Sequence, residues 1–301
     1  MIPCRGRGSH YIFLGGIVLL IRIFVAVIIL LWVPAGSIWA IGDAKRGEYL
    51  GAIANCVSCH TAEAKDSAPY AGGRAIKSPF GTFYGPNITR HDTHGIGKWN
   101  ESDFFRAMRF GKRPDGTAYF PAFPFSSYTM VTDSDLTDLW AYLRTIPPSN
   151  VPSREHDLGF LFSWRFPFRL WKWLFFTPGA FISDLKQTPQ INRGAYLVRA
   201  LGHCSECHTP RNLLGVPKQS RYMAGGKGPD GKKVSNITPA GLKKWSDKDL
   251  KEFMVTGLYP DGDVVNETMG IVIRNSTSKL LSVDLDAMIA YLRTLPRLEK
   301  E

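Results

Sequence analysis

Cysteine is scarce in this sequence, with five cysteines among 301 residues. Four of them form two close pairs, Cys56 with Cys59 and Cys204 with Cys207, and the fifth, Cys4, lies near the N-terminus. A disulfide between residues three apart closes a very small loop and connects no distant segments. The cysteines therefore do not predict the disulfide framework that supports many small exported domains.

Several other sequence signatures are missing as well. The chain has no fingerprint for binding a dinucleotide or a flavin, so substrate oxidation with such a cofactor is expected to belong to another chain. It also has no recognisable nucleic-acid-binding motif. Charged residues make up 21% and hydrophobic residues 44% of the chain, which argues against extensive disorder and against a protein with many membrane spans.

The one long apolar run covers residues 11–33 and is interrupted only by Arg22. As a spanning helix, this run would hold Arg22 near the bilayer centre, at a cost of about 2.5–3.5 kcal/mol. As a signal peptide, it would combine a long basic segment with the apolar segment 23–33 and a cleavage site after Ala40. We therefore predict that residues 1–40 are a signal peptide or an uncleaved membrane anchor, and that the rest is periplasmic.

The predicted mature chain is basic. Residues 1–40 contain three arginines and no acidic residue, so their removal lowers the formal net charge from +11 to +8. A positive surface favours solubility, and it can also attract an acidic protein or anionic lipid headgroups. The charge alone does not separate these alternatives.

Each cysteine pair is followed directly by a histidine, which gives CVSCH at 56–60 and CSECH at 204–208. A zinc site would need further ligands, and a thioredoxin-like pair has no use for the adjacent histidine. On a helix, the two cysteines can form thioethers with a haem while the next residue directs its imidazole at the iron. We therefore predict two covalently bound haem c groups, one on Cys56, Cys59 and His60 and one on Cys204, Cys207 and His208.

The two halves of the chain repeat each other well beyond these motifs. RGEYL at 46–50 matches RGAYL at 193–197, and NIT, KW, PDG and AYLRT also recur, at offsets of 146 to 149 residues. This is the pattern of a tandem duplication. The predicted divisions are a leader at 1–40, domain 1 at 41–148, an aromatic-rich linker at 149–190 and domain 2 at 191–301.

Apolar residues near the end of each half recur with the spacing of one buried helical face, and strand signals are weak. Helices are expected to begin at Asp43, Asn100 and Ser246. The last helix of each half is expected to be capped by Thr132 or Ser282 and to stop before Pro147 or Pro296.

The chain resembles the class I cytochromes c, and more closely the multihaem cytochrome subunits of bacterial periplasmic alcohol, aldehyde and sugar-acid dehydrogenases. The resemblance runs through CVSCHT, AGGR, PFGTFYGPNIT, GIGKW, GHCSECHTPRN and TGLYPDGDVVNETMGIVIRNSTS. It implies an all-α fold, a tandem pair of class I cytochrome c domains with long loops wrapped around covalent haems. In each domain the first and last helices would cross, with Gly47 near Tyr142 and Gly194 near Tyr291.

The resemblance also implies a methionine as second axial ligand of each iron. For haem 2 this ligand is Met269, which is expected to precede the last helix, with a loop between them. For haem 1 the family motif PAMP is replaced by PAFP, which puts Phe123 in the ligand position, and phenylalanine cannot coordinate iron. Met130 is the leading replacement, while Met108 and the histidines His91 and His94 are further alternatives.

These features predict an electron-transfer protein. It would take single electrons from a periplasmic dehydrogenase and pass them to quinone, a terminal oxidase or a small cytochrome, with membrane association possible through the leader. The alternative is a peroxidase-like haem enzyme with an open sixth position at haem 1. A gas sensor is a third hypothesis, although no output domain is recognisable.

Overall fold

The computed structural model describes residues 41–301 apart from 161–164, 229–230, 266 and 300–301. The predicted leader, residues 1–40, lies outside the described residues. Within the part that is described, no helix is both long enough and apolar enough to cross a membrane. The predicted domain boundaries stay predictions.

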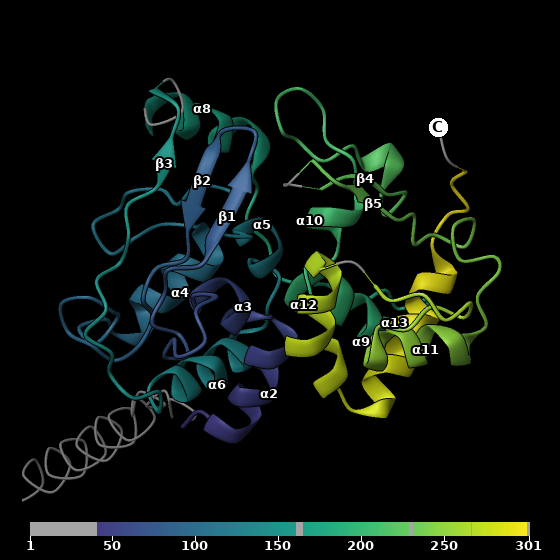
Figure 1. Ribbon diagram of the computed structural model, residues 1–301, viewed down its shortest axis with the longest axis horizontal. Helices are drawn as coiled ribbons and strands as arrows, with labels where there is room; N and C mark the ends of the chain where they lie inside the picture. Colours follow the sequence, from purple (N-terminus) through teal and green to yellow (C-terminus); the bar gives the residue numbers. More distant parts are fainter. Residues whose placement is uncertain (1–40, 161–164, 229–230, 266, 300–301) are drawn as a thin grey trace, which may run out of the picture. The chain divides into compact units, whose positions relative to one another are not determined.

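The first half of the described chain is mainly helical (Figure 1). Its helices are α2 (Ala44–Ile53), α3 (Cys56–His60), α4 (Glu101–Phe110), α5 (Phe125–Tyr128) and α6 (Asp133–Leu143). The segment that follows contains α8 (Arg165–Phe175).

The second half repeats this order with small differences. Its helical elements are α9 (Pro189–Tyr196), η1 (Leu197–Leu201), α10 (Ser205–His208), η2 (Gln219–Arg221), α11 (Asp247–Thr256), α12 (Glu267–Asn275), η3 (Thr277–Lys279) and α13 (Ser282–Thr294). η1 is a π-helical turn that continues α9, whereas η2 and η3 are short 3-10 turns.

The predicted helix starts are largely correct. Asp43, Asn100 and Ser246 are the N-cap residues of α2, α4 and α11, and each side chain accepts hydrogen bonds from first-turn amides, as such residues do. Thr132 caps α6 in the same way. The prediction for Ser282 was wrong, because α13 already includes Ser282 and its hydroxyl accepts a hydrogen bond from the Lys251 ammonium instead.

The expectation of a purely α-helical fold missed several short strands. β1 (Ala75–Ser78) pairs antiparallel with β2 (Gly81–Tyr84), which pairs with β3 (Asp157–Leu158), and β4 (Gly226–Lys227) pairs with β5 (Lys233–Val234). β1, β2, β4 and β5 lie in segments that were expected to be long loops, and β3 lies in the predicted linker. They are two to four residues long. The alternation of apolar and polar residues that reveals a strand in a sequence cannot be recognised over so few positions.

The first and last helices of each half cross with their backbones in contact. A Cβ atom at Gly47 would lie 1.9 Å from the Asp138 carbonyl oxygen, and one at Gly194 would lie 1.9 Å from that of Ala287. The same added atoms would lie 2.8 Å and 2.9 Å from the Cβ atoms of Tyr142 and Tyr291. The two predicted glycine contacts are thus confirmed, because only glycine permits this approach.

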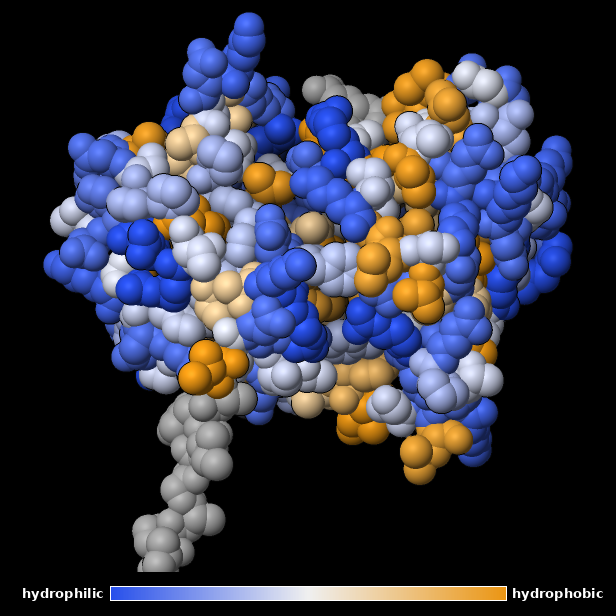
Figure 2. Space-filling view, turned by 90° about the horizontal axis from the view of Figure 1, so that it is seen from below, coloured by the Kyte–Doolittle hydropathy of each residue, from blue (hydrophilic) through white to orange (hydrophobic). Residues whose placement is uncertain are grey.

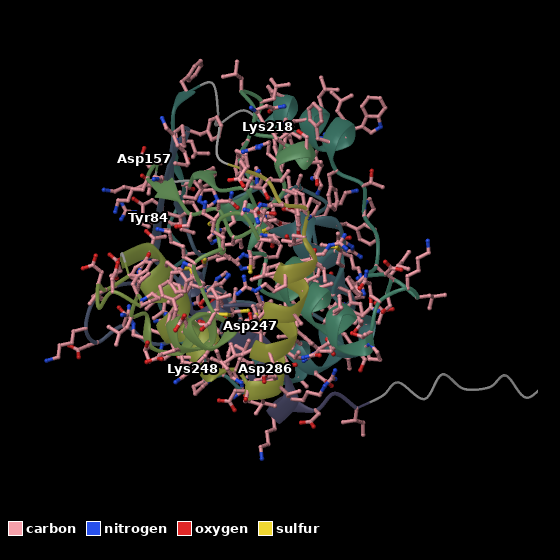
Figure 3. The ribbon with its side chains drawn as sticks, turned by 90° about the vertical axis from the view of Figure 1, so that its right-hand side faces the viewer. Tyr84, Asp157, Lys218, Asp247, Lys248 and Asp286 are labelled. Carbon is pink, nitrogen blue, oxygen red and sulfur yellow. The ribbon has the colours of Figure 1, made fainter. Side chains whose placement is uncertain are left out.

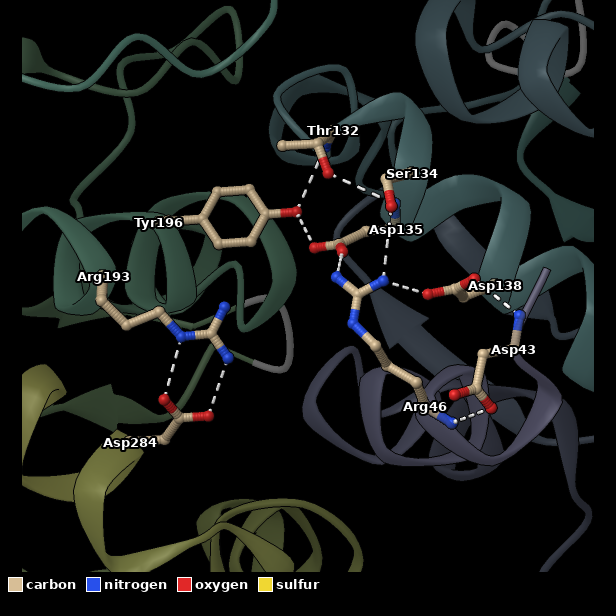
Figure 4. Close-up of polar contacts among 9 residues, drawn as sticks. All are labelled: Asp43, Arg46, Thr132, Ser134, Asp135, Asp138, Arg193, Tyr196 and Asp284. Atoms are coloured by element: carbon tan, nitrogen blue, oxygen red, sulfur yellow. Dashed lines mark hydrogen bonds and ion pairs between the residues drawn. The ribbon is translucent and has the colours of Figure 1, made fainter. Parts of the chain in front are cut away.

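The two halves also meet in a pair of reciprocal contacts, of which Figure 4 shows the one made by Tyr196. The Tyr49 hydroxyl donates to Asp284 and accepts from the Leu281 amide, at 2.7 Å and 3.0 Å. In the opposite direction, the Tyr196 hydroxyl donates to Asp135 and accepts from the Thr132 amide. Each tyrosine therefore docks at the start of the other half's last helix.

Arginines from the same halves as the carboxylates complete both contacts. Arg46 forms ion pairs with Asp135 and Asp138, and Arg193 binds Asp284 through two hydrogen bonds of 2.9 Å and 2.8 Å. Burial raises the pKa of Asp284, but the hydrogen bonds from Arg193 and Tyr49 more than offset this and hold the pKa below its usual value. Burial raises the pKa of Tyr49 to about 12, so this hydroxyl remains a donor at neutral pH.

We predict that Gly194→Ala lowers the free energy of unfolding by about 1–3 kcal/mol, the usual cost of overpacking. Alanine has the higher helix propensity by about 1 kcal/mol, but its methyl group would overlap the Ala287 carbonyl. Gly179→Ala is the matched control, since no atom lies within 4 Å of a Cβ placed there. Thermal unfolding followed by circular dichroism checks both, and an equal melting temperature for the two variants would contradict the role given to Gly194.

Candidate haem-attachment sites

Both CxxCH segments form short helices, α3 and α10, that follow a sharp turn of the chain. The residues just before the first cysteines, Asn55 and His203, have left-handed backbones with φ of 54° and 39°. The four cysteines are half-buried and make no disulfide. Burial, followed by the neighbouring cysteine, raises the pKa of Cys56 and of Cys204 to about 12.

The two motif histidines are oriented in the same way. Nδ1 of His60 lies 2.7 Å from the Pro86 carbonyl oxygen, and Nδ1 of His208 lies 2.8 Å from the Ser235 carbonyl oxygen. A carbonyl only accepts, so each Nδ1 carries the proton and each Nε2 keeps its lone pair for a metal. Burial lowers the pKa of both imidazoles, against the opposing effect of these bonds, which favours the neutral form that binds iron.

The chain after each motif returns to it through matching contacts. Thr61 and Thr209 accept hydrogen bonds through Oγ1 from the amides of Tyr70 and Met223, at 3.0 Å and 3.1 Å. The carbonyls of His60 and His208 accept from the amides of residues 72 and 225. Both motif histidines are therefore held at their backbone as well as at Nδ1, and this donor set fits a covalently attached haem.

The first of these return loops passes very close to its motif. A Cβ atom at Gly85 would lie 1.7 Å from the Cys59 carbonyl oxygen, so the loop can approach α3 only because this position is glycine. Gly85 directly precedes Pro86, whose carbonyl orients His60.

A zinc site finds no support in the part of the chain that the structure describes. No group of three or more histidine, cysteine, aspartate or glutamate side chains there is arranged to hold a metal ion.

The candidate axial methionine of haem 2, Met269, lies in the first turn of α12 and is half-buried. Met269 precedes the last helix, α13, and the short segment 276–281 separates α12 from it, as expected. A helical position still allows the side chain to project to one side of the helix. Its role as a ligand stays a prediction.

Phe123 and Met269 occupy equivalent positions in the two halves. In each half, a hairpin bridge joins equivalent residues, Lys112 with Ala118 and Leu258 with Val264, at a constant offset of 146 residues. The same offset continued from Ala118 and Val264 places Phe123 opposite Met269. The Phe123 ring packs against Tyr119 and Tyr128, with centroids 5.3 Å and 5.5 Å apart.

The alternative ligands for haem 1 lie in different settings. Met130 follows α5 and is half-buried, and its carbonyl accepts a hydrogen bond from the Phe181 amide. Met108 is buried within α4, in the place that Met254 occupies in α11. His91 and His94 stack on each other with centroids 5.0 Å apart. Met130 thus stays the leading prediction.

The two CxxCH segments contact the opposite halves of the chain. Asn275 donates to the Ser58 hydroxyl at 2.8 Å, and at the equivalent place Ser126 donates to Glu206, also at 2.8 Å. Ser58 lies between Cys56 and Cys59, and Glu206 lies between Cys204 and Cys207. Both haem-attachment helices therefore line one interface.

Sequence reasoning missed the residues of this interface. His203 was given no role, yet it is half-buried and its ring meets Tyr128 edge-on, with centroids 5.6 Å apart. Tyr128 in turn donates to the Ala54 carbonyl at 2.8 Å, two residues before Cys56. The repeated tyrosines of RGEYL and RGAYL were a usable signal, but a repeat does not show that each copy contacts the other.

Comparison with known proteins agrees with the geometry. The family model described as cytochrome c matches residues 44–147. A dihaem cytochrome c-type protein of Cereibacter sphaeroides is 43% identical over 262 residues, which cover 86% of this chain and 88% of that protein.

Two further relatives are subunits of larger enzymes. The fructose dehydrogenase cytochrome subunit of Gluconobacter japonicus is 39% identical over 84% of this chain, and the gluconate 2-dehydrogenase cytochrome c subunit of Pantoea cypripedii is 36% identical over 83%. This chain spans 52% and 59% of the length of those two relatives. The matches to the cytochrome c model and to the dihaem protein show that the chain belongs to the cytochrome c family.

Proposed function

We propose that the chain is a dihaem cytochrome c, built as a tandem pair of class I domains, that carries single electrons from a dehydrogenase to a respiratory acceptor. The observation that carries the proposal is the duplicated CxxCH geometry. The Nδ1 contact of the motif histidine, the threonine contact that follows and the glycine-mediated helix crossing each occur twice. With a single haem, one of these two complete sets of contacts would have no haem to hold.

The residues have distinct roles in this proposal. Cys56 and Cys59 hold one haem and Cys204 and Cys207 the other, while His60 and His208 supply the proximal ligands. When bound, each haem iron supplies a one-electron Fe(III)/Fe(II) couple. One electron enters from a reduced donor, and one leaves to an oxidised acceptor.

The donor we propose is a periplasmic dehydrogenase, because several relatives carry the names of dehydrogenase cytochrome subunits. The acceptor is a quinone, a terminal oxidase or a small cytochrome, and Met269 and Met130 are the proposed sixth ligands. Residues 1–40 are proposed to direct export or to anchor the protein to the inner membrane.

The positive charge of the chain supports docking to an acidic donor. Lys243, Lys244 and Lys248 are exposed around the start of α11, and Lys248 projects at the molecular edge in Figure 3. Lys251, in contrast, forms an ion pair with Asp286 at 2.6 Å. The exposed lysines therefore favour an electrostatic encounter, which salt would weaken.

A second function is favoured by one observation, the phenylalanine in the ligand position of the first half. If Phe123 is not replaced by Met130, haem 1 has an open position, and a peroxidase-like activity becomes possible.

We predict that the mature protein exceeds its polypeptide mass by two haem groups, because both motifs present the same donor set. Intact-mass spectrometry of protein from cells competent in cytochrome maturation measures this directly. Cys204→Ala with Cys207→Ala should remove one haem and leave the first, and a wild-type mass with a single haem would refute the dihaem proposal.

We predict that carbon monoxide binds the dithionite-reduced wild-type protein slowly, because thioether ligation closes both irons. Met269→Ala should bind one equivalent rapidly, and Met130→Ala should open the other haem. Met108→Leu serves as the matched control, since this methionine is buried within α4. Rapid binding by the wild type that Met130→Ala does not alter would reject Met130 and favour the enzyme hypothesis.

A further inference from the structure

Helix α8 (Arg165–Phe175) buries a lysine and leaves several large apolar side chains exposed. Its lysine, Lys172, is only 8% exposed. Its apolar residues Leu170, Trp173 and Leu174 are 50%, 77% and 55% exposed. A surface helix in water normally buries such leucines and tryptophans and exposes its lysine.

The buried lysine holds the helix in this orientation. Its ammonium donates to the carbonyls of Phe110 and Gly111 and lies 4.5 Å from the centre of the Phe125 ring. These carbonyls end α4, where a cation is favoured by the helix dipole. Burial, and then the charge of Lys112, lowers the pKa of Lys172 to about 8. The orientation of α8 is therefore fixed by specific contacts.

The inner aromatic residues of α8 reinforce this placement. Phe168 packs against Phe120 and Trp171, with centroids 5.5 Å and 5.8 Å apart. The Trp171 indole donates to the Leu214 carbonyl at 2.8 Å, which holds the loop after α10 beside the helix. Figure 1 shows α8 at the upper edge of the molecule, beside that loop.

This loop extends the exposed apolar surface. Leu213 is fully exposed and Leu214 is 62% exposed. We call the surface formed by Leu170, Trp173, Leu174, Leu213 and Leu214 the α8 patch. Large exposed apolar residues gathered on neighbouring segments are typical of interaction sites. On the lower face in Figure 2, by contrast, apolar side chains occur in small groups between hydrophilic ones.

Cations accompany the α8 patch. Arg169 neighbours Leu170 and is exposed, and Lys218 closes the loop that carries Leu213 and Leu214 and is exposed as well. Figure 3 shows Lys218 at the same end of the molecule as α8. Exposed Lys112 lies near enough to Lys172 to affect its pKa. Helices that lie in the surface of an anionic bilayer have this composition, with tryptophan and leucine beside lysine and arginine.

We propose that the α8 patch inserts into the headgroup region of an anionic lipid bilayer, with Trp173 and Leu174 entering the acyl boundary and Arg169 and Lys218 facing lipid phosphates. Anionic lipid is favoured over an acidic protein because exposed leucines and a tryptophan make up the patch, and the two cations Arg169 and Lys218 stand beside them. The inference is independent of haem content and of the fate of residues 1–40.

The test is site-directed spin labelling of the full chain in a Cys4→Ser background. Leu174→Cys is labelled and mixed with vesicles of phosphatidylglycerol and phosphatidylethanolamine, and mass spectrometry confirms that a single label is present. Collision with oxygen should rise relative to collision with a water-soluble nickel chelate, because the label enters lipid. Val283→Cys is the control, since Val283 is also exposed and belongs to α13 in the lower half of Figures 1 and 3.

The label position separates this proposal from simple anchoring by residues 1–40. A vesicle-bound protein whose Leu174 label stays in water would overturn the proposal, as would a label that is shielded equally without vesicles, which would indicate a second copy. Shielding that appears only when a dehydrogenase subunit is added would overturn it too. Trp173→Glu should reduce the oxygen effect at Leu174 while leaving circular dichroism and the visible spectrum unchanged.

Discussion

The backbone contact between the first and last helices of each half is the constraint on which the rest of the structure depends. At Gly47 and Gly194 the crossing leaves no room for even one carbon atom. α2 ends directly before α3, and α9 continues through η1 to α10, so each crossing also fixes where its CxxCH segment begins. The position of each motif histidine thus follows from a contact more than ten residues earlier in the chain.

The reciprocal contacts of Tyr49 and Tyr196 extend this constraint from each half to the pair. Each tyrosine lies on the crossing helix of one half and binds a buried carboxylate that an arginine of the other half holds in place. Hydrogen bonds to charged groups are worth about 1.5–3 kcal/mol, and an interface made twice keeps both halves in register. The two CxxCH helices also contact the opposite halves, through Ser58 and Glu206.

The sequence was most informative where chemistry restricts the choice of residue. Cys56, Cys59 and His60 predict the attachment chemistry by themselves, and the repeat of RGEYL located the glycines that meet the last helices. Capping residues such as Asn100 also marked helix starts correctly, because their side chains bond nearby amides. These signals are local, or they depend on a backbone contact that only one residue type permits.

The remainder depends on contacts between distant residues. β2 pairs with β3 from the linker, and Lys172 is buried against the carbonyls that end α4. The start of α13 shifted by one residue because Ser282 pairs with Lys251 rather than with its own helix. Hydrophobic periodicity and capping rules describe only neighbouring residues, so they cannot predict these long-range partners.

The central claim, a rigid carrier with two one-electron centres, is tested most directly by a coulometric titration of the mature full-length protein followed through its visible absorption. The account predicts reversible uptake of two electrons per chain, one for each CxxCH motif, with the reduced spectrum of haem c appearing in both steps. Uptake of one electron per chain, or a second step without any haem signal, would contradict it.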